Sequence, residues 1–316
     1  MSGSGAVLIT GATGLVGHRL AEALIRDGVA VRALTRDPVA AARRLDPKIS
    51  RIGWDGLRVP ESAVSGSSAI VHLAGEPLFA GPLTAKRRRR IRASRVESTR
   101  SLVDALGKLP AAQRPEVFAC ASAVGFYGSC GDEPLAESAP TGEGFLADVC
   151  RAWESAAFAA VELGVRTAAL RIGVVLAREG GALAMLVRIF KLGAGGRLGR
   201  GDQWFPWIHV DDLVSLIRSV LGDARYRGAI NAVAPEPVRN ADFTRALARS
   251  LKRPALFPVP AFAVRLVLGE LSGELLGSRR VVPRRAIECG FRFQHAAIAS
   301  ALATELQGRT AVGKVQ

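Results

Sequence analysis

The sequence predicts an α/β fold: a Rossmann-type doubly wound parallel sheet followed by a small, mainly helical C-terminal lobe. Apolar runs of strand length alternate with stretches of helical periodicity over residues 1–180, the pattern of parallel strands joined by helices. The alternation loosens afterwards, and from Pro235 onward helix-like stretches are separated by prolines. We therefore expect a sheet domain over residues 1–180, rejoined by parts of 205–235, and a substrate lobe over 181–316.

The stretch that opens the chain predicts a strand, a turn and a helix. Residues 7–10 are apolar or β-branched, and residues 18–25 carry apolar side chains at helical spacing. Between them lie Gly11, Gly14 and Gly17. Glycines allow a sharp turn and the close approach of a pyrophosphate, which binds the free N–H groups at the positive end of the helix. The alternative is a strand-to-helix turn with incidental glycines, but the complete order of strand, turn and helix favours a nucleotide site.

The end of the second predicted strand, residues 30–35, indicates which nucleotide binds. An NAD site usually has an acidic residue there, which accepts a hydrogen bond from the ribose 2′-hydroxyl. This chain has Thr35 and Arg36 instead, and a guanidinium can hold a 2′-phosphate in its fork. Asp37 is the counter-argument, and we interpret it as a turn residue before Pro38. The sequence therefore predicts NADP(H) as the cofactor of the domain over residues 1–180.

Two further strand ends carry candidate contacts. Residues 51–56 predict a third strand and its loop, where Asp55 either accepts from the adenine amino group or forms a plain turn. Residues 68–76 predict an apolar strand that ends in small residues, among them Ala74 and Gly75. Small residues let the backbone approach a ligand at the carboxyl end of a parallel strand, where such sheets bind their cofactors.

Composition excludes several classes of protein. The chain has 316 residues, of which 49% are apolar, so it can form a substantial core. It contains no run of about 18 apolar residues, the length a membrane span needs, and it shows no signal peptide. The four cysteines form no C-x-x-C pair and have no histidines clustered with them. We therefore expect no metal site, no membrane contact and a reducing, cytoplasmic location.

The formal net charge of +15 is partly concentrated in residues 86–92, with Arg95 and Arg100 beyond. Such a run could bind nucleic acid, or it could be a solvated helix beside an anionic cofactor. No aromatic residues are interleaved to stack on bases, so we expect no specific nucleic-acid partner.

The later part of the sheet domain and the start of the lobe carry further elements. Helices are predicted over residues 87–109, over 145–163 and through Leu221, and strands over 117–125 and 166–176. Residues 128–145 are rich in Gly, Pro and acidic residues and predict an active-site-like loop. Asp211 or Asp212 is the predicted N-cap of the helix that runs through Leu221.

Several motifs resemble those of the extended short-chain dehydrogenase/reductases, the group of nucleotide-sugar epimerases and dehydratases. They are residues 10–17, 73–75, 170–175, 209–212 and 228–231, in the family's order. A narrower set, residues 73–77, 94–95, 153–154 and 205–209, resembles an atypical branch often labelled epimerase family protein and sometimes cell-division inhibitor. Residues 258–305 resemble the C-terminal domain of unknown function of that branch.

The resemblance implies a set of cofactor contacts, carried over position by position. They come from the glycine turn, the ends of the second and fourth predicted strands, the long basic helix and the strand at residues 166–176. The residues are Gly11, Thr13, Gly14, Leu15, Val16, Gly17, Thr35, Arg36, Leu73, Ala74, Gly75, Arg95 and Val175.

The family's acid/base pair is missing from this chain. The resemblance implies a Ser or Thr, a Tyr and a Lys; the Lys ammonium and the nicotinamide charge lower the Tyr pKa, so that the phenol can exchange protons near neutral pH. With Glu154 as the register mark, the Tyr and Lys positions fall on Leu146 and Cys150, which cannot do this. The Ser122 position is kept. Tyr127 in the following loop is either a substitute acid/base or a packed aromatic whose hydroxyl bonds the loop.

Three functions are consistent with these residues. The first is an NADP(H)-dependent oxidoreductase or epimerase that acts on a carbonyl or nucleotide-sugar-like small molecule with a non-standard acid/base. The second is an NADP(H)-binding redox sensor or regulatory protein with little or no turnover, which the missing Tyr and Lys favour. The third is an interaction protein in cell-division control. Either a monomer or a homodimer is expected. In a dimer formed through the predicted helix over residues 87–109, the arginines among residues 87–92 would repel those of the second chain.

Overall fold

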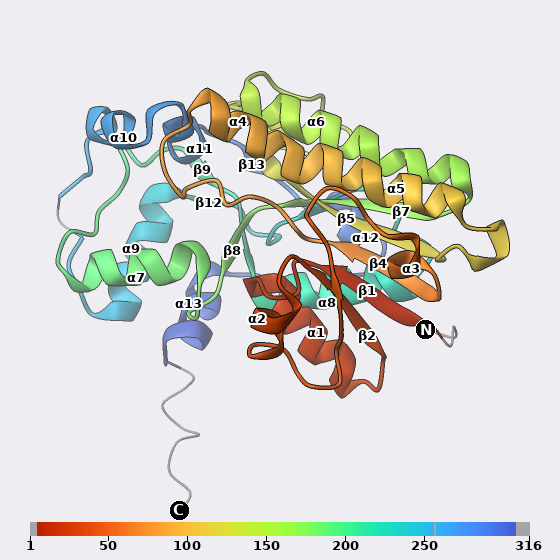
Figure 1. The fold of residues 1–316 in the computed structure, drawn as a ribbon. Helices are drawn as coiled ribbons and strands as arrows, with labels where there is room; N and C mark the ends of the chain where they lie inside the picture. The colour runs from red at the N-terminus through yellow and green to blue at the C-terminus, as the bar shows by residue number, and fades with distance from the viewer. Residues whose placement is uncertain (1–4, 256, 308–316) are drawn as a thin grey trace, which may run out of the picture.

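The computed structural model describes residues 5–255 and 257–307, and a parallel sheet of seven strands forms its centre (Figure 1). The strand order is β11-β7-β5-β4-β1-β2-β3. The strands are β1 (Ala6–Thr10), β2 (Val31–Thr35), β3 (Ser50–Gly53), β4 (Ser67–His72), β5 (Val117–Ala123), β7 (Arg166–Ile172) and β11 (Gly228–Ala232). All of their pairings are parallel, so all seven carboxyl ends lie at one edge of the sheet.

Helices cover both faces of the sheet, because successive side chains of each buried strand point to opposite sides. Val7 and Ile9 of β1 pack on one side, where α1 (Leu15–Arg26) and α8 (Val210–Gly222) lie. Leu8 packs on the other side, beneath the helices α3 (Glu61–Val64), α5 (Ser98–Lys108) and α6 (Phe145–Phe158). This three-layer arrangement confirms the predicted doubly wound α/β fold.

The strand order reverses at β1, which lies between β2 and β4. The chain moves outward from β1 to β2 and β3, and then crosses back to β4 and onward to β5, β7 and β11. In open α/β sheets the loops on the two sides of such a point separate at the carboxyl edge, and ligands bind there. The glycine turn that follows β1 lies at this point.

The long basic helix is interrupted by a wider turn. In place of one helix over residues 87–109, the chain forms α4 (Ala85–Arg92), a π-helical turn η1 (Ala93–Glu97) and then α5. The hydroxyl of Thr84 caps α4 by accepting from the backbone N–H of Arg87. A π turn inserts one extra residue and rotates the side chains within it relative to the flanking helix.

The prediction of a single strand over residues 166–176 is wrong, because the chain leaves the seven-stranded sheet at Gly173. β7 ends at Ile172, and β8 (Val174–Leu176) pairs instead with β10 (Trp207–His209). A Cβ on Gly173 would lie 2.8 Å from the carbonyl oxygen of Pro206, so the two backbones can approach this closely only at glycine.

The strand and loop predicted over residues 51–56 are confirmed, because β3 ends at Gly53 and its loop follows. Two other predictions differ from the structure. α6 ends at Phe158 and continues as the 3₁₀ turn η4 (Ala159–Leu163). Neither Asp211 nor Asp212 caps α8. The N-cap is His209, whose Nδ1 accepts from the backbone N–H of Asp211 at 3.2 Å.

The remaining helices form the C-terminal lobe. α7 (Gly181–Lys191), α9 (Asn240–Leu251) and α13 (Ile298–Gln307) enclose a second core with Leu176, Trp207 and Phe243. The lobe also contains β9 (Trp204–Phe205), β12 (Val238–Arg239), α10 (Ala261–Leu268), η5 (Gly269–Leu271) and α11 (Ser272–Leu276). In the described part of the chain, no helix is both long and apolar enough to cross a membrane.

The chain then returns to the sheet domain. β13 (Arg280–Val281) pairs with β6 (Pro134–Leu135) inside the loop predicted over residues 128–145, and α12 (Arg284–Glu288) packs on β11. The short elements α2 (Pro38–Ala42), η2 (Ala111–Gln113) and η3 (Val124–Tyr127) complete the structure.

Candidate functional site

The turn after β1 forms a cradle with no room for side chains. Gly11 has φ +71°, and a Cβ on it would lie 2.9 Å from backbone atoms of Leu73 and Ala74. A Cβ on Gly17 would lie 2.8 Å from the carbonyl carbon of Gly11 and nearer still to its oxygen. The exposed Gly14 is the N-cap of α1 and offers no side chain to cap it. The positive end of α1 is therefore left for an anion.

A buried hydrogen-bond chain holds the loops after β1 and β4 together. The hydroxyl of Thr10 accepts from the backbone N–H groups of Leu73 (3.2 Å) and Ala74 (3.1 Å) and bonds His72 Nδ1 at 2.6 Å. His72 Nε2 lies 3.2 Å from the hydroxyl of Ser98. Because the Thr10 hydroxyl already accepts twice, it donates to Nδ1, and the neutral ring carries its proton on Nε2. Neither side chain was predicted from the sequence, although each ends a strand beside the glycine turn.

Burial lowers the pKa of His72 to about 3, and the charge of Arg95 acts in the same direction. The unfolded chain takes up a proton on this ring below its ordinary pKa near 6.5. Because only the unfolded chain takes up this proton, His72 should lower the unfolding free energy as the pH falls from about 6.5 towards 3, by about 1.4 kcal/mol per pH unit.

Urea unfolding at pH 7 and pH 5 measures this effect. We expect wild type to lose about 2 kcal/mol more of its unfolding free energy between the two pH values than His72→Gln does. His18→Gln, which removes an exposed histidine of α1, is the control and should keep the full loss. An identical loss in wild type and His72→Gln would contradict the assignment.

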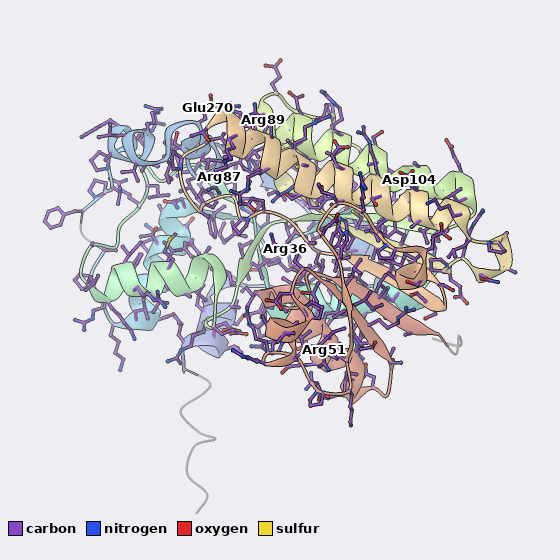
Figure 2. All side chains as sticks on the ribbon, viewed as in Figure 1. Arg36, Arg51, Arg87, Arg89, Asp104 and Glu270 are labelled. Atoms are coloured by element: carbon purple, nitrogen blue, oxygen red, sulfur yellow. The ribbon has the colours of Figure 1, made fainter. Side chains whose placement is uncertain are left out.

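Arg36 follows β2 and is exposed at the carboxyl edge, where Figure 2 labels it near the middle of the molecule. Within residues 5–255 and 257–307 it makes no ion pair. The Asp37 carboxylate instead accepts from the backbone N–H of Ala40 and caps α2, which confirms it as a turn residue. The hydroxyl of Thr35 accepts from the backbone N–H of Asp37 at 3.4 Å. The cation beside the β2 terminus is therefore free for a phosphate.

Asp55 shapes the turn that follows β3. Its Oδ1 accepts from the backbone N–H groups of Leu57 and Arg58, each at 2.7 Å. The hydrogen bond from Arg58, and after it the bond from Leu57, lowers the pKa of the Asp55 carboxyl below its ordinary value. The geometry supports the interpretation of Asp55 as a turn residue.

The π turn η1 brings Arg95 against the loop after β4. Its Nη2 donates to the carbonyl of Glu76 at 3.1 Å, and its guanidinium lies 5.4 Å from the ring centre of Trp153. A Cβ on Gly75 would lie 3.3 Å from Arg95 Cζ. The neighbouring Ser94 hydroxyl accepts from the backbone N–H of Glu76 at 2.9 Å. Arg95 has no ion-pair partner among the residues that the structure describes, so a partly buried cation faces the carboxyl edge.

The turn between β8 and α7 lies beside the start of α1. A Cβ on Gly181 would lie 3.3 Å from Leu15 Cδ2 and 3.8 Å from the carbonyl oxygen of Val175. Val175 is therefore beside the start of α1, although 160 residues separate it from Leu15 in the sequence. The structure thus brings the glycine turn, the β4 loop and Val175 to one edge.

Part of the basic run on α4 contacts its own protein. Arg87 donates to the carbonyl of Leu78 at 2.9 Å, Arg90 pairs with Glu76 at 2.7 Å, and Arg88 pairs with Glu270. Figure 2 shows Arg87, Arg89 and Glu270 gathered at one end of α4. These contacts order the loop after β4 and link α4 to the lobe.

Ser122 is buried and its hydroxyl belongs to an ion-pair network. It donates to Glu154 Oε1 at 2.6 Å. Both oxygens of Glu154 also accept from Arg171, from Nε and Nη2, each at 2.9 Å. The side chains of this ion pair are each 6% exposed, and the sequence analysis did not foresee Arg171 as a partner.

Tyr127 belongs to the same network. Its ring is fully buried, its hydroxyl donates to Asn231 Oδ1 at 2.7 Å, and it accepts from Arg171 Nη1 at 2.8 Å. Burial raises the pKa of this phenol. Asn231 also donates to the carbonyl of Leu135, so the network fastens the loop over residues 128–145 to the sheet. These contacts support the interpretation of Tyr127 as a packed aromatic with a bonded hydroxyl.

The two α6 positions implied for Tyr and Lys face the end of β5. A Cβ on Gly125 would lie 3.7 Å from Leu146 Cβ and 3.9 Å from Cys150 Sγ. Cys150 is buried, which raises the pKa of its thiol to about 12 and leaves it protonated and unreactive at neutral pH. Neither side chain can exchange a proton with a ligand here.

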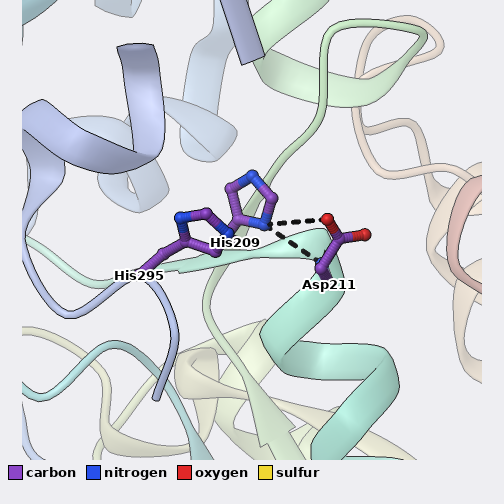
Figure 3. A group of neighbouring side chains, drawn as sticks. All are labelled: His209, Asp211 and His295. Carbon is purple, nitrogen blue, oxygen red and sulfur yellow. Dashed lines mark hydrogen bonds and ion pairs between the residues drawn. The ribbon is translucent and has the colours of Figure 1, made fainter. Parts of the chain in front are cut away.

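A second polar cluster lies where α8 begins (Figure 3). Donor atoms of His209, Asp211 and His295 lie within 4.8 Å of one another, and the two imidazole rings stack with centres 3.7 Å apart. His209 Nδ1 caps α8, whereas Nε2 lies 3.0 Å from Glu305 Oε1 but is not in line for a hydrogen bond. The Asp212 carboxylate accepts from the backbone N–H of His295 at 2.9 Å. The cluster therefore ties the C-terminal segment to α8.

Comparison with known proteins agrees with this architecture. Residues 7–232 match the NAD dependent epimerase/dehydratase family, and residues 259–305 match a domain of unknown function, DUF1731. The chain is 42% identical over 306 residues to the chloroplastic epimerase family protein SDR39U1 homolog of Arabidopsis thaliana, covering 95% of this chain and 86% of that protein. It is 34% identical to the epimerase family protein YfhF of Bacillus subtilis, covering 97% and 99%.

Two solved structures extend the comparison to three dimensions. A crystal structure of the human epimerase family protein SDR39U1 with NADPH has a TM-score of 0.84 at 31% identity, covering 95% of this chain and 99% of that one. A nucleoside-diphosphate sugar epimerase from Corynebacterium glutamicum has a TM-score of 0.78 at 36% identity, covering 96% of this chain and 58% of that one. With its glycine cradle, its sheet order and these matches, the chain belongs to the NAD-dependent epimerase/dehydratase family.

Proposed function

We propose that this protein binds NADP(H) at the carboxyl edge of its sheet and transfers hydride between the cofactor and a small carbonyl or carbinol compound. The observation that carries the proposal is the cradle of Gly11 and Gly17 at the strand-order reversal, with Arg36 at the end of β2 where NAD sites carry an acidic residue. The NADPH in the human relative's structure supports the same cofactor. A nucleotide sugar is one candidate substrate, since related solved structures are sugar epimerases.

The chain's own residues divide the binding of the cofactor between them. The N-terminus of α1 receives the pyrophosphate, Arg36 holds the 2′-phosphate, and Arg95 supplies a second positive charge beside the β4 loop. Val175 packs beside the start of α1. Bound NADPH supplies the hydride, and the protein positions it against the substrate.

Replacing Arg36 by alanine tests the cofactor assignment. We expect the dissociation constant for NADPH to rise about 10- to 100-fold, since a charge-assisted hydrogen bond contributes about 1.5–3 kcal/mol, and that for NADH to change less than about threefold. Fluorescence titration of the reduced cofactors gives both constants. Arg51→Ala on β3, which lies apart from Arg36 in Figure 2, is the control. An equal rise in the dissociation constants for NADPH and NADH would contradict the assignment to NADP(H).

Hydride transfer is tested by following NADPH oxidation with a panel of carbonyl compounds and nucleotide sugars. Net oxidation of NADPH supports an oxidoreductase, whereas an epimerase would return the hydride and is detected by epimerisation of a sugar without net change of the cofactor. The second candidate, a redox sensor that binds NADP(H) without turnover, is favoured by Leu146 and Cys150 at the positions implied for the acid/base pair. Tight binding of NADPH with neither NADPH oxidation nor epimerisation of any compound would support the sensor.

A further inference from the structure

A carboxylate from the C-terminal lobe lies near Gly125, beside the two α6 side chains that cannot serve as an acid/base. Glu274 belongs to α11, within the segment that matches the domain of unknown function. A Cβ placed on Gly125 would lie 3.5 Å from Glu274 Oε2, as well as 3.7 Å from Leu146 Cβ and 3.9 Å from Cys150 Sγ. The chain therefore folds back over about 150 residues to bring this oxygen beside Gly125, just after the end of β5.

Glu274 is held in place by a buried arginine. Arg279 Nη1 donates to Oε2 at 2.7 Å, and Nη2 lies 3.4 Å from Oε1. The Arg279 side chain is 4% exposed, while that of Glu274 is 22% exposed. Next to Arg279, Ser278 fastens the segment to the opposite loop: its carbonyl accepts from the backbone N–H of Cys130 at 2.7 Å. The carboxylate is therefore fixed in position and still reaches solvent.

The other proton-exchanging groups near the end of β5 are buried and either hydrogen-bonded or protonated, whereas the Glu274 side chain, although paired with Arg279, is 22% exposed. Ser122 donates to Glu154, the Tyr127 hydroxyl bonds Asn231 and Arg171, and the Cys150 thiol is buried and protonated. Glu154 itself is enclosed by its ion pair. Among the described residues around Gly125, Glu274 combines a titratable oxygen, a fixed position and a route to water.

We propose that Glu274 is the catalytic acid/base of this protein, in place of the Tyr and Lys that the family resemblance implies; this rests on the proposed hydride transfer. When a carbinol is oxidised, its hydroxyl proton moves to the Glu274 carboxylate while its hydride, with two electrons, moves to the oxidised cofactor. The products are a carbonyl, the reduced cofactor and a carboxylic acid that releases its proton to water. In the reverse direction the carboxylic acid donates that proton to the carbonyl oxygen.

The test compares Glu274→Gln, which keeps the shape of the side chain, with Glu288→Gln on α12, an exposed carboxylate, as the control. On this proposal the Glu274 carboxylate would lie near the nicotinamide ring of a bound cofactor, where its charge would favour the oxidised, positively charged form. We expect Glu274→Gln to weaken NADP⁺ relative to NADPH by about 3- to 10-fold in titrations that need no turnover. With a substrate identified in the panel of compounds, the kcat of Glu274→Gln should fall about 100- to 1000-fold below that of wild type. Glu288→Gln should change neither value.

The outcomes separate the two proposals. Failure of wild type to bind either cofactor would overturn the proposed function itself. Normal binding with an unchanged NADP⁺ to NADPH affinity ratio in Glu274→Gln would overturn the role of Glu274, whether or not wild type turns over. Folding of the variant is checked by its NADPH affinity, which should stay within about threefold of wild type because the glycine cradle is untouched.

Discussion

Replacing Glu154 by alanine should lower the unfolding free energy by about 3–5 kcal/mol. The substitution leaves the Arg171 guanidinium buried without its carboxylate, and the cost of an unpaired buried charge is the largest penalty that a single substitution can bring here. It also removes the acceptor of the Ser122 hydroxyl. Urea unfolding at neutral pH measures the loss.

Two further variants distinguish the cost of leaving Arg171 unpaired from the cost of simply removing a glutamate side chain. Glu97→Ala removes an exposed partner of Arg100 and should cost less than about 1 kcal/mol. The double variant Glu154→Ala, Arg171→Met removes both charges and should recover part of the loss, because no charge is then left unpaired. A double variant no more stable than Glu154→Ala alone would show that the ion pair is not the source of the cost.

Replacing Gly17 by alanine should weaken NADPH binding by about 100-fold or more. The new methyl group would meet the backbone of Gly11, so either α1 or the turn must move, and a shift of about 1 Å at a binding turn has an effect of this order. Stability should fall as well, by about 1–3 kcal/mol, as for other overpacked sites. Calorimetric titration with NADPH gives the affinity.

Gly222→Ala is the matched control for this variant. Gly222 is also helical, at the end of α8, and a Cβ there meets no atom within 4 Å among those described. We expect its NADPH affinity to equal that of wild type. Wild-type affinity in Gly17→Ala would mean that the cofactor does not bind against this turn.

Local patterns in the sequence were sufficient to predict six of the seven strands of the sheet, whereas β11 was named only as a family motif. Each buried strand is a short apolar run between helices of clear periodicity, so the order of elements and the glycine turn at β1 could be predicted from neighbouring residues alone. Asp37 was likewise predicted from its neighbour Pro38, and it does cap α2. Such features depend on contacts within a few residues.

Features that depend on distant contacts could not be predicted in this way. The strand over residues 166–176 breaks because the backbone of Pro206 approaches Gly173, and no neighbour of Gly173 signals this. His209 caps α8 in place of an aspartate because Glu305 and His295 fix its ring from the far end of the lobe. The π turn that brings Arg95 to the loop after β4 lies inside the stretch predicted as one helix over residues 87–109, and its extra residue was not predicted.

The residues of the candidate site likewise fall into those that neighbouring residues predict and those that depend on distant contacts. The glycine cradle and Arg36 lie next to strands that the sequence predicts, so they could be named in advance. Thr10 and His72 are joined only when β1 and β4 pair, and Glu274 reaches the end of β5 only when the C-terminal segment returns to the sheet. Residue type alone made Tyr127 a catalytic candidate, whereas its burial among Asn231 and Arg171 could be known only from the fold.

The return of the C-terminal segment has a consequence for the newly made chain. All seven strands of the sheet are complete once residue 232 has been synthesised, so a polypeptide still attached to the ribosome can already form the cofactor cradle. β13, which pairs with β6, and α13, which completes the second core, are made only afterwards. A nascent chain can therefore form the cofactor cradle early, but its second core stays incomplete until α13 has been made.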